Sequence, residues 1–342
     1  MVQILVADAH MDPNAASDTR ETPLILAAYA GHTAVATALL RLKADVNAPG
    51  RSGATPLLYA VQRGHLSVAR ALIAAKADVD ATGPSGDLAP LHWAARRGRT
   101  DIVSFLLASK ATVDLRSAAR RSTALMLAAA EGNADTTKTL LEANAAVGLA
   151  DAIGNTALSL AAASMTHSAV PAAPAASVQP SGAAAATAAA ATAAGAAATN
   201  ISAPMPSAAG AAIAAGAGAE ESGPRGSVTA ATRTVAAAAA SAAAEAARDP
   251  ALVTVESLLK AKADPNALAA GQQNAVHIAA AAGRWEILDA LIFAGGSFSV
   301  KNGVGRKAYD VALSVGNKPL ADAIKKAKKH QKNGGIFQGL NQ

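Results

Sequence analysis

The stretch Thr55-Pro56-Leu57-Leu58-Tyr59-Ala60, closed by Gly64-His65 and followed by Leu72-Ile73, decides the fold. Its opening has counterparts in Thr22-Pro23-Leu24, Ala89-Pro90-Leu91 and Thr123-Ala124-Leu125. Positions 22, 55, 89 and 123 are separated by 33, 34 and 34 residues, and each copy is followed by a glycine and an aliphatic pair. A fixed period of this length indicates a repeat protein, in which each unit packs only against its neighbours.

Each unit predicts two short helices. Threonine is a favoured N-cap, and proline is tolerated at the first helical position because its missing N–H has no partner there. Glycine readily adopts the left-handed conformation that ends a helix. The first helix of the quoted unit should therefore begin after Thr55 and end at Gly64, and the second should bury Leu72-Ile73.

With this period and a Thr-Pro-Leu-His type box, the chain resembles the ankyrin repeat family over nearly all of its length outside one insertion. The resemblance implies an all-α solenoid of helix-turn-helix units with short β-hairpin loops. One departure recurs, because lysine replaces the family's usual glycine after the second helix at Lys43, Lys76, Lys110 and Lys262. A left-handed lysine costs about 1 kcal/mol, partly offset by a cation near the helix C-terminus. We expect these repeats to be individually less stable.

Spacing locates the insertion. The box position precedes the aliphatic pair by 17 residues at 22–39, 55–72, 89–106, 123–140 and 274–291, but by 102 residues from Thr156 to Leu258. The extra residues fall near 166–249, between the two helices of the fifth repeat. This segment is rich in alanine, serine and proline and has no aromatic residue and no leucine. Such a composition cannot bury enough apolar surface to offset chain entropy, which predicts a disordered, low-complexity insertion.

The predicted organisation has five parts. They are an N-terminal half repeat at 1–16, repeats one to four with the first helix of repeat five at 17–165, the insertion at 166–249, the second helix of repeat five with repeat six and a C-terminal capping repeat at 250–332, and a flexible tail at 333–342.

Composition excludes several classes of protein. The chain of 342 residues has no cysteine, which rules out disulfides, cysteine-ligated zinc and thiol catalysis. We therefore expect an intracellular protein, cytoplasmic or nuclear. The start has no basic segment and too short an apolar run for a signal peptide, and no stretch predicts a membrane span. The formal net charge of +6 comes largely from Lys325, Lys326, Lys328, Lys329 and Lys332.

No pattern indicates an enzyme. His92 and His277 occupy the histidine of the family's box, where the resemblance implies a structural role. Gly303-Val304-Gly305-Arg306-Lys307 lacks the Gly-Lys-Ser/Thr ending of a phosphate loop. Histidine spacing typical of metal sites and nucleophile elbows are both missing from the sequence. We therefore predict no catalytic residues, no metal site and no cofactor.

The resemblance also implies where a partner would bind, because ankyrin arrays usually contact partners through the hairpin tips and the exposed side of the first helix. We transfer these positions residue by residue. The predicted partner-binding residues are Tyr29, Arg51, Gln62, Arg63, Arg96, Arg97, Arg120 and Glu131. Arginine is enriched at binding hot spots and pairs bidentately with carboxylates. The competing interpretation is an ordinary solvated, charged surface.

These features favour a non-catalytic scaffold or adaptor that binds a protein or peptide with an acidic segment on the concave face. One alternative is a binder of nucleic acid or an anionic membrane surface through Lys325–Lys332, although these lysines also suit the solvated end of a last helix. Another alternative is a targeting fragment of a larger multidomain protein. The sequence leaves the identity of the partner open, because a fold does not specify its ligand.

Overall fold

The structure, a computed structural model, describes residues 12–18, 20–50, 53–83, 88–164 and 248–332. The chain divides into two units, and all the described residues belong to the first, which comprises 1–168 and 245–342. The second unit, 169–244, lies outside the described residues, as does the predicted insertion apart from Arg248 and Asp249. Residues 1–11 and 333–342, which the predicted half repeat and tail include, lie outside them too.

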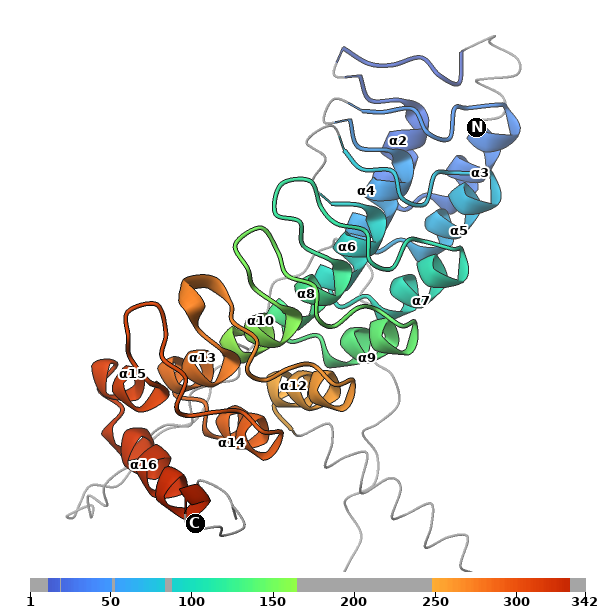
Figure 1. Cartoon of the computed structure of the whole chain (residues 1–342). Coiled ribbons are helices and arrows are strands. Elements are labelled where there is room, and N and C mark those ends of the chain that lie inside the picture. The colour runs from blue at the N-terminus through green and yellow to red at the C-terminus, as the bar shows by residue number, and fades with distance from the viewer. Residues whose placement is uncertain (1–11, 19, 51–52, 84–87, 165–247, 333–342) are drawn as a thin grey trace, which may run out of the picture. The chain divides into compact units, whose positions relative to one another are not determined.

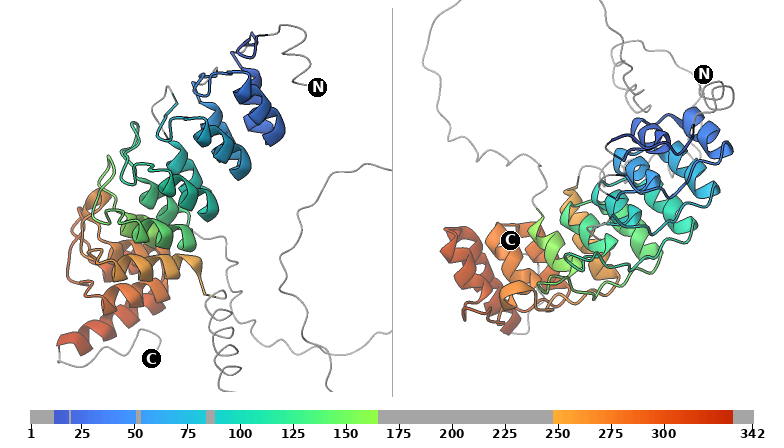
Figure 2. Two further views of the ribbon diagram at one scale, coloured as in Figure 1. Left: turned by 90° about the vertical axis from the view of Figure 1, so that its right-hand side faces the viewer. Right: turned by 90° about the horizontal axis from the view of Figure 1, so that it is seen from above.

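The described residues form helices in two rows (Figure 1). The first-helix row contains α2 (Pro23–Ala30), α4 (Pro56–Arg63), α6 (Pro90–Arg96), α8 (Ala124–Ala130), α10 (Ala157–Ala163), α13 (Ala275–Ala282) and α15 (Ala308–Ser314). The second-helix row contains α3 (Thr33–Arg41), α5 (Leu66–Ala74), α7 (Thr100–Ala108), α9 (Ala134–Glu142), α12 (Pro250–Lys260), α14 (Trp285–Phe293) and α16 (Lys318–Lys332). Each first helix packs on the first helix of the next repeat. Figure 2 shows the two rows from other sides. The predicted all-α repeat solenoid is confirmed.

The local signals act as the sequence predicts. The Oγ1 of Thr55 accepts a hydrogen bond from the backbone N of Leu58 at 3.3 Å, so that it caps α4. Gly64 ends α4 with φ at 86°, a left-handed conformation in which glycine is strongly favoured. Between these two ends, Leu57 and Val61 are fully buried against the neighbouring helices.

The connecting loops contain no strands in the described part of the chain. They are closed by short backbone contacts, such as the bond from Gly50 N to Ala54 O at 3.0 Å. Isolated β-bridges join Ala150 to Thr156 and Ala269 to Gln273. Within the described residues, these contacts join too few residues to build a β-strand.

The lysines after the second helices adopt the left-handed conformation that the repeat pattern demands. The φ angles are 66° at Lys43, 71° at Lys76, 68° at Lys110 and 63° at Lys262. Asn144 has φ at 61° at the equivalent position of the fourth repeat, and Gly295 has φ at 92°. The second helix therefore ends in the same way whichever residue stands there.

Asparagine and aspartate side chains connect successive repeats through the loops. The Oδ1 of Asn47 accepts from the backbone N of Asp78 at 2.9 Å, and that of Asn14 accepts from Asp45 N at 2.7 Å. Equivalent bonds run from Thr112 N to Asp80, from Ala146 N to Asp114 and from Ser297 N to Asn266. We call this series of bonds the loop ladder. Gly148 stands at the same position of the fourth repeat and has no side chain to continue it.

A second series of hydrogen bonds joins successive repeats at the C-terminal ends of the first helices. In three of the described repeats, the side chain after the helix-ending glycine reaches back to a carbonyl at the end of the preceding first helix. His65 Nε2 donates to Tyr29 O at 3.2 Å, and Asn133 Nδ2 donates to Ala95 O at 3.0 Å. In the same way Arg284 Nη1 donates to Ser164 O at 3.1 Å.

The fifth repeat is assembled from α10 and α12. These two helices pack on each other, while α10 contacts α8 and α13 and α12 contacts α9 and α14. Arg284 adds an ion pair from its Nη2 to the carboxylate of Asp249, the N-cap residue of α12. Arg284 of the sixth repeat therefore contacts residues on both sides of the insertion.

Candidate functional site

The exposed face of the first-helix row carries aromatic and basic side chains at equivalent positions of successive repeats. Positions four, seven and eight residues after the box residue share one helix face, because residues three or four apart lie side by side on a helix. In α2, in α4 and in α6 with its C-cap residue, these positions are Leu26, Tyr29, Ala30, Tyr59, Gln62, Arg63, Trp93, Arg96 and Arg97. Leu26 is 56% exposed and Tyr29 is 45% exposed, although both are large apolar or aromatic side chains.

Arg63 and two tyrosines form the first half of this face. The guanidinium carbon of Arg63 lies 4.4 Å from the ring centroid of Tyr29, a cation–π distance. The Tyr29 and Tyr59 rings are 6.0 Å apart with an interplanar angle of 76°, an edge-to-face arrangement. The stack orients the guanidinium while its side chain stays exposed to solvent.

Trp93 and two arginines form the second half. The guanidinium carbons of Arg96 and Arg97 lie 5.8 Å and 6.0 Å from the Trp93 ring centroid. Arg96 also pairs with Glu131 of the next repeat, with Arg96 Nε and Glu131 Oε1 3.3 Å apart. Both side chains of this pair are about half exposed, at 48% and 50%, so water screens the attraction strongly.

Not every predicted residue joins this cluster. Gln62 is half-buried, and Arg120 is exposed in the loop before α8, where its carbonyl accepts from Ala152 N at 2.8 Å. Arg51 lies outside the described residues. Arg96 and Glu131, both predicted to contact a partner, contact each other. The residue prediction missed Leu26, Tyr59 and Trp93, which the repeat spacing could have indicated because all three stand four residues after the box residue.

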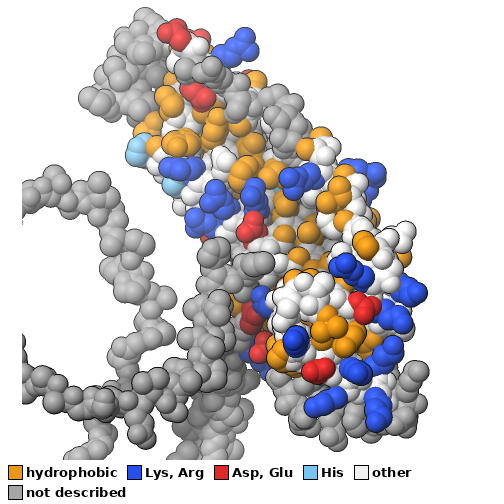
Figure 3. Space-filling view, turned by 90° about the vertical axis from the view of Figure 1, so that its left-hand side faces the viewer, with side chains coloured by type: hydrophobic (Ala, Val, Ile, Leu, Met, Phe, Trp, Pro, Cys, Tyr) orange, Lys and Arg blue, Asp and Glu red, His pale blue; other side chains and the backbone are white. Residues whose placement is uncertain are grey.

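We call Tyr29, Tyr59, Arg63, Trp93, Arg96 and Arg97 the aromatic–arginine face. Figure 3 views the molecule from the side of the first-helix row and the loops, and on it Lys and Arg side chains lie among hydrophobic ones. A mixture of aromatic groups and guanidinium groups is typical of binding hot spots, since aromatic rings add area at low entropy cost and arginine adds directed hydrogen bonds.

His92 has a structural role. Its side chain is 1% exposed, and its Nε2 donates to Leu115 O at 2.9 Å and to Ser122 O at 3.1 Å. Its Nδ1 accepts from Ala89 N at 3.2 Å, which requires the neutral ring. Burial lowers the pKa of His92, against the opposing effect of the two carbonyls. The ring therefore connects α6 to the next loop and has no lone pair left for a metal.

His277 repeats this arrangement after the interruption. It is fully buried, and its Nε2 donates to Arg306 O at 3.2 Å. Burial again lowers its pKa, while contacts with the carbonyls of Arg306 and Val300 act in the opposite direction. The predicted structural use of the box histidines agrees with these contacts.

The lysine-rich segment of the C-terminal region lies on α16. One face of this helix is buried through Leu320, Ala321, Ile324 and Ala327. Lys325, Lys326 and Lys329 are exposed, and Lys328 is partly buried. The helix α16 is therefore amphipathic. Its apolar face packs on α15, and its described lysines lie outside that buried face.

The residues that the structure describes lack two kinds of feature. Among them, no group of three or more histidine, aspartate or glutamate side chains is arranged to hold a metal ion. Within the same residues, no helix combines the length and the apolar character needed to cross a membrane.

Comparison with protein families gives two matches. A family model described as ankyrin repeats (3 copies) matches residues 1–83 and 91–171, and one described as ankyrin repeats (many copies) matches residues 63–107. No curated protein matches the chain. The residues matched by one or other model include the boxes at 22, 55, 89, 123 and 156 that begin α2, α4, α6, α8 and α10. The chain therefore belongs to the ankyrin repeat family.

Proposed function

We propose that the chain is a non-catalytic scaffold or adaptor that binds a protein segment rich in carboxylates on the aromatic–arginine face. Ankyrin repeats are generally protein–protein interaction modules, and the family is typically non-enzymatic. The observation that carries the proposal is the stacking of Arg63 on Tyr29 at 4.4 Å, next to Trp93 with its two arginines.

The charges on this face favour an acidic ligand. Arg63 and Arg97 are exposed, and the ring contacts leave the guanidinium edges able to donate hydrogen bonds to a carboxylate. Arg96 is partly neutralised by Glu131 at 3.3 Å. We therefore assign the main charge recognition to Arg63 and Arg97, and an orienting role to the Arg96–Glu131 pair.

The aromatic rings supply the apolar part of the contact. Tyr29 and Leu26 expose apolar surface on α2, next to the basic side chains of α4. A ligand that places an apolar side chain against Tyr29 and carboxylates against Arg63 and Arg97 would use both properties at once. Stacked arginine loses little side-chain entropy on binding, because its position is already restrained.

A peptide-display selection against the full chain tests this proposal. The expected result is enrichment of sequences with an apolar or aromatic residue next to aspartate or glutamate, with binding lost for Arg63→Glu/Arg97→Glu. The matched control reverses two exposed charges of the second-helix row, in Arg41→Glu/Lys138→Glu, and should bind like the wild type. Selected peptides that bind both variants equally well would overturn the proposal.

A further inference from the structure

A second surface lies in the other row of helices. Between α12 and α14 there is a hollow of about 570 Å³. Its apolar lining is formed by Leu252, Leu259, Trp285, Ala290, Phe293 and Ala294, and its charged lining by Glu256, Lys260, Glu286 and Asp289. We call this surface the α12–α14 groove.

Repeat packing accounts for Trp285, which is partly buried against the core, but not for Phe293. Phe293 is 80% exposed, although it is a large apolar side chain. It stands two residues after the first aliphatic of its repeat, where the other second helices have exposed Arg41, Ala74, Ala108, Glu142 and Lys260. A polar or small residue therefore satisfies the fold at this position, and the exposed phenyl ring extends the apolar lining of the groove, a kind of surface that marks an interaction site.

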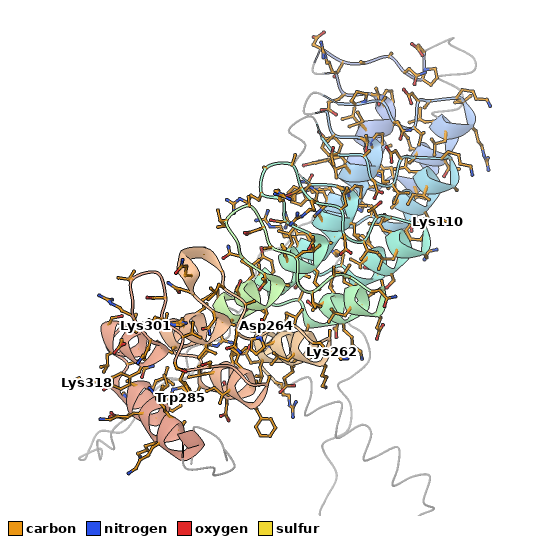
Figure 4. All side chains as sticks on the ribbon, in the orientation of Figure 1. Lys110, Lys262, Asp264, Trp285, Lys301 and Lys318 are labelled. Carbon is orange, nitrogen blue, oxygen red and sulfur yellow. The ribbon has the colours of Figure 1, made fainter. Side chains whose placement is uncertain are left out.

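The lining of the groove has Glu286 at one end and Lys260 at the other, and the two arginines near the first end, Arg248 and Arg284, are each paired with a carboxylate. At the end where both helices begin, Trp285 and Glu286 lie near Leu252. At the other end, Lys260 lies near Phe293, and Lys262 follows just beyond α12. Figure 4 shows Trp285 and Lys262 at opposite ends of this helix pair. Of the two central carboxylates, Glu256 is paired with Arg248 at 3.4 Å, and Asp289 also has a partner.

We propose that two copies of this chain associate groove to groove about a two-fold axis. A two-fold axis across the groove lays the Lys260 end of each copy on the Glu286 end of the other. Phe293 of each copy then enters the hollow of the second copy beside Leu252 and Trp285, and Lys260 faces Glu286. The same patch carries a protruding ring, a hollow and both charges, which is what a self-complementary interface requires.

This interface leaves the proposed partner site accessible, because the groove belongs to the second-helix row and the aromatic–arginine face to the first. A dimer would present two such faces at once, so that a partner with two acidic segments binds with increased avidity. The proposal stands on the groove alone and does not depend on the function of the other face.

Sedimentation velocity of the full chain over a range of concentrations tests the proposal. The wild type should show a monomer–dimer equilibrium, and Phe293→Ser should weaken the association constant by at least about tenfold. Val315→Ser removes an apolar side chain that is 57% exposed outside the groove, and should associate like the wild type. A wild type that stays monomeric, or a Phe293→Ser variant that associates as strongly, would overturn the proposal.

Exchanging two charges tests the proposal independently, without removing the phenyl ring. Lys260→Glu and Glu286→Lys should each weaken association, because each creates like charges across the interface. Combined in one chain, the two substitutions restore opposite charges and should restore association. If the combined variant stays as weak as either single variant, the two-fold arrangement is wrong.

Discussion

Arg284 forms an ion pair with Asp249, and through this contact the sixth repeat holds the start of α12. Both side chains are only 21% exposed. The same guanidinium donates from Nη1 to Ser164 O at 3.1 Å, just after α10. Ser164 and Asp249, on the two halves of the fifth repeat, are 85 positions apart in sequence and are thus joined by one residue of the next repeat.

Arg284→Ala should lower the free energy of unfolding by about 1–3 kcal/mol, because it removes a charged donor from two poorly exposed acceptors. The loss should be concentrated in α12, where amide hydrogen exchange should accelerate first. Arg248→Ala is the matched control, since it removes a more exposed pair with Glu256 and should have little effect. Equal effects of the two substitutions would contradict the role given to Arg284.

The loop ladder of asparagine and aspartate side chains can be completed at Gly148. A Cβ at Gly148 meets no atom within 4 Å, and its backbone is not left-handed. Gly148→Asn should raise the free energy of unfolding by about 1–2 kcal/mol, by adding an acceptor for Asp264 N and by restricting the unfolded chain. Gly148→Ala supplies only the second effect, about 0.4–1 kcal/mol. Urea unfolding measures both, and equal gains would show that no new bond forms.

Left-handed lysines should limit stability. Lys76→Gly relieves a φ of 71° and should raise the free energy of unfolding by about 1 kcal/mol, less the small benefit of a cation at the helix end. Asn144→Gly should gain less, because asparagine tolerates the left-handed region better than lysine. Urea midpoints compare the two variants directly. A larger gain at Asn144 than at Lys76 would show that backbone strain does not set the order.

The free energy of unfolding should decrease as the pH is lowered into the range where histidines titrate. The folded state holds His92 and His277 with lowered pKa values, so below the free value of about 6.5 the unfolded chain binds more protons than the folded one. The stability present above that pH is therefore lost as the pH falls toward the folded pKa values. Thermal unfolding between neutral pH and the onset of carboxylate titration should show this decline. It should be shallower in His92→Gln, which keeps a donor but cannot titrate.

The sequence predicted the repeat geometry because its signals are local. Thr55 and Gly64 determine where α4 begins and ends through bonds within a few residues, and the same residues recur at fixed spacing. The left-handed lysines could be predicted for the same reason. Arg284 could be recognised as the residue after a helix-ending glycine, but its contact with Asp249 depends on the packing of α10 with α12 across the interruption.

The candidate site was only partly predictable. Position in the repeat places Tyr29 and Arg63 on the same exposed face, but stacking between them depends on the distance between neighbouring helices. Arg96 and Glu131 were assigned to a partner one by one, and their mutual pairing follows from the register of α6 against α8. Trp93 was not predicted, because a tryptophan among packing residues cannot be told from a core residue in sequence, and its partial burial depends on the packing of α6.

The central claim is that carboxylates of a partner bind Arg63 and Arg97. The most direct test is the dissociation constant of a selected acidic peptide for the wild type, Arg63→Glu/Arg97→Glu and Arg41→Glu/Lys138→Glu, at one fixed ionic strength. We predict that the first variant binds at least about tenfold more weakly and that the second binds like the wild type. Equal dissociation constants for all three proteins would contradict the account.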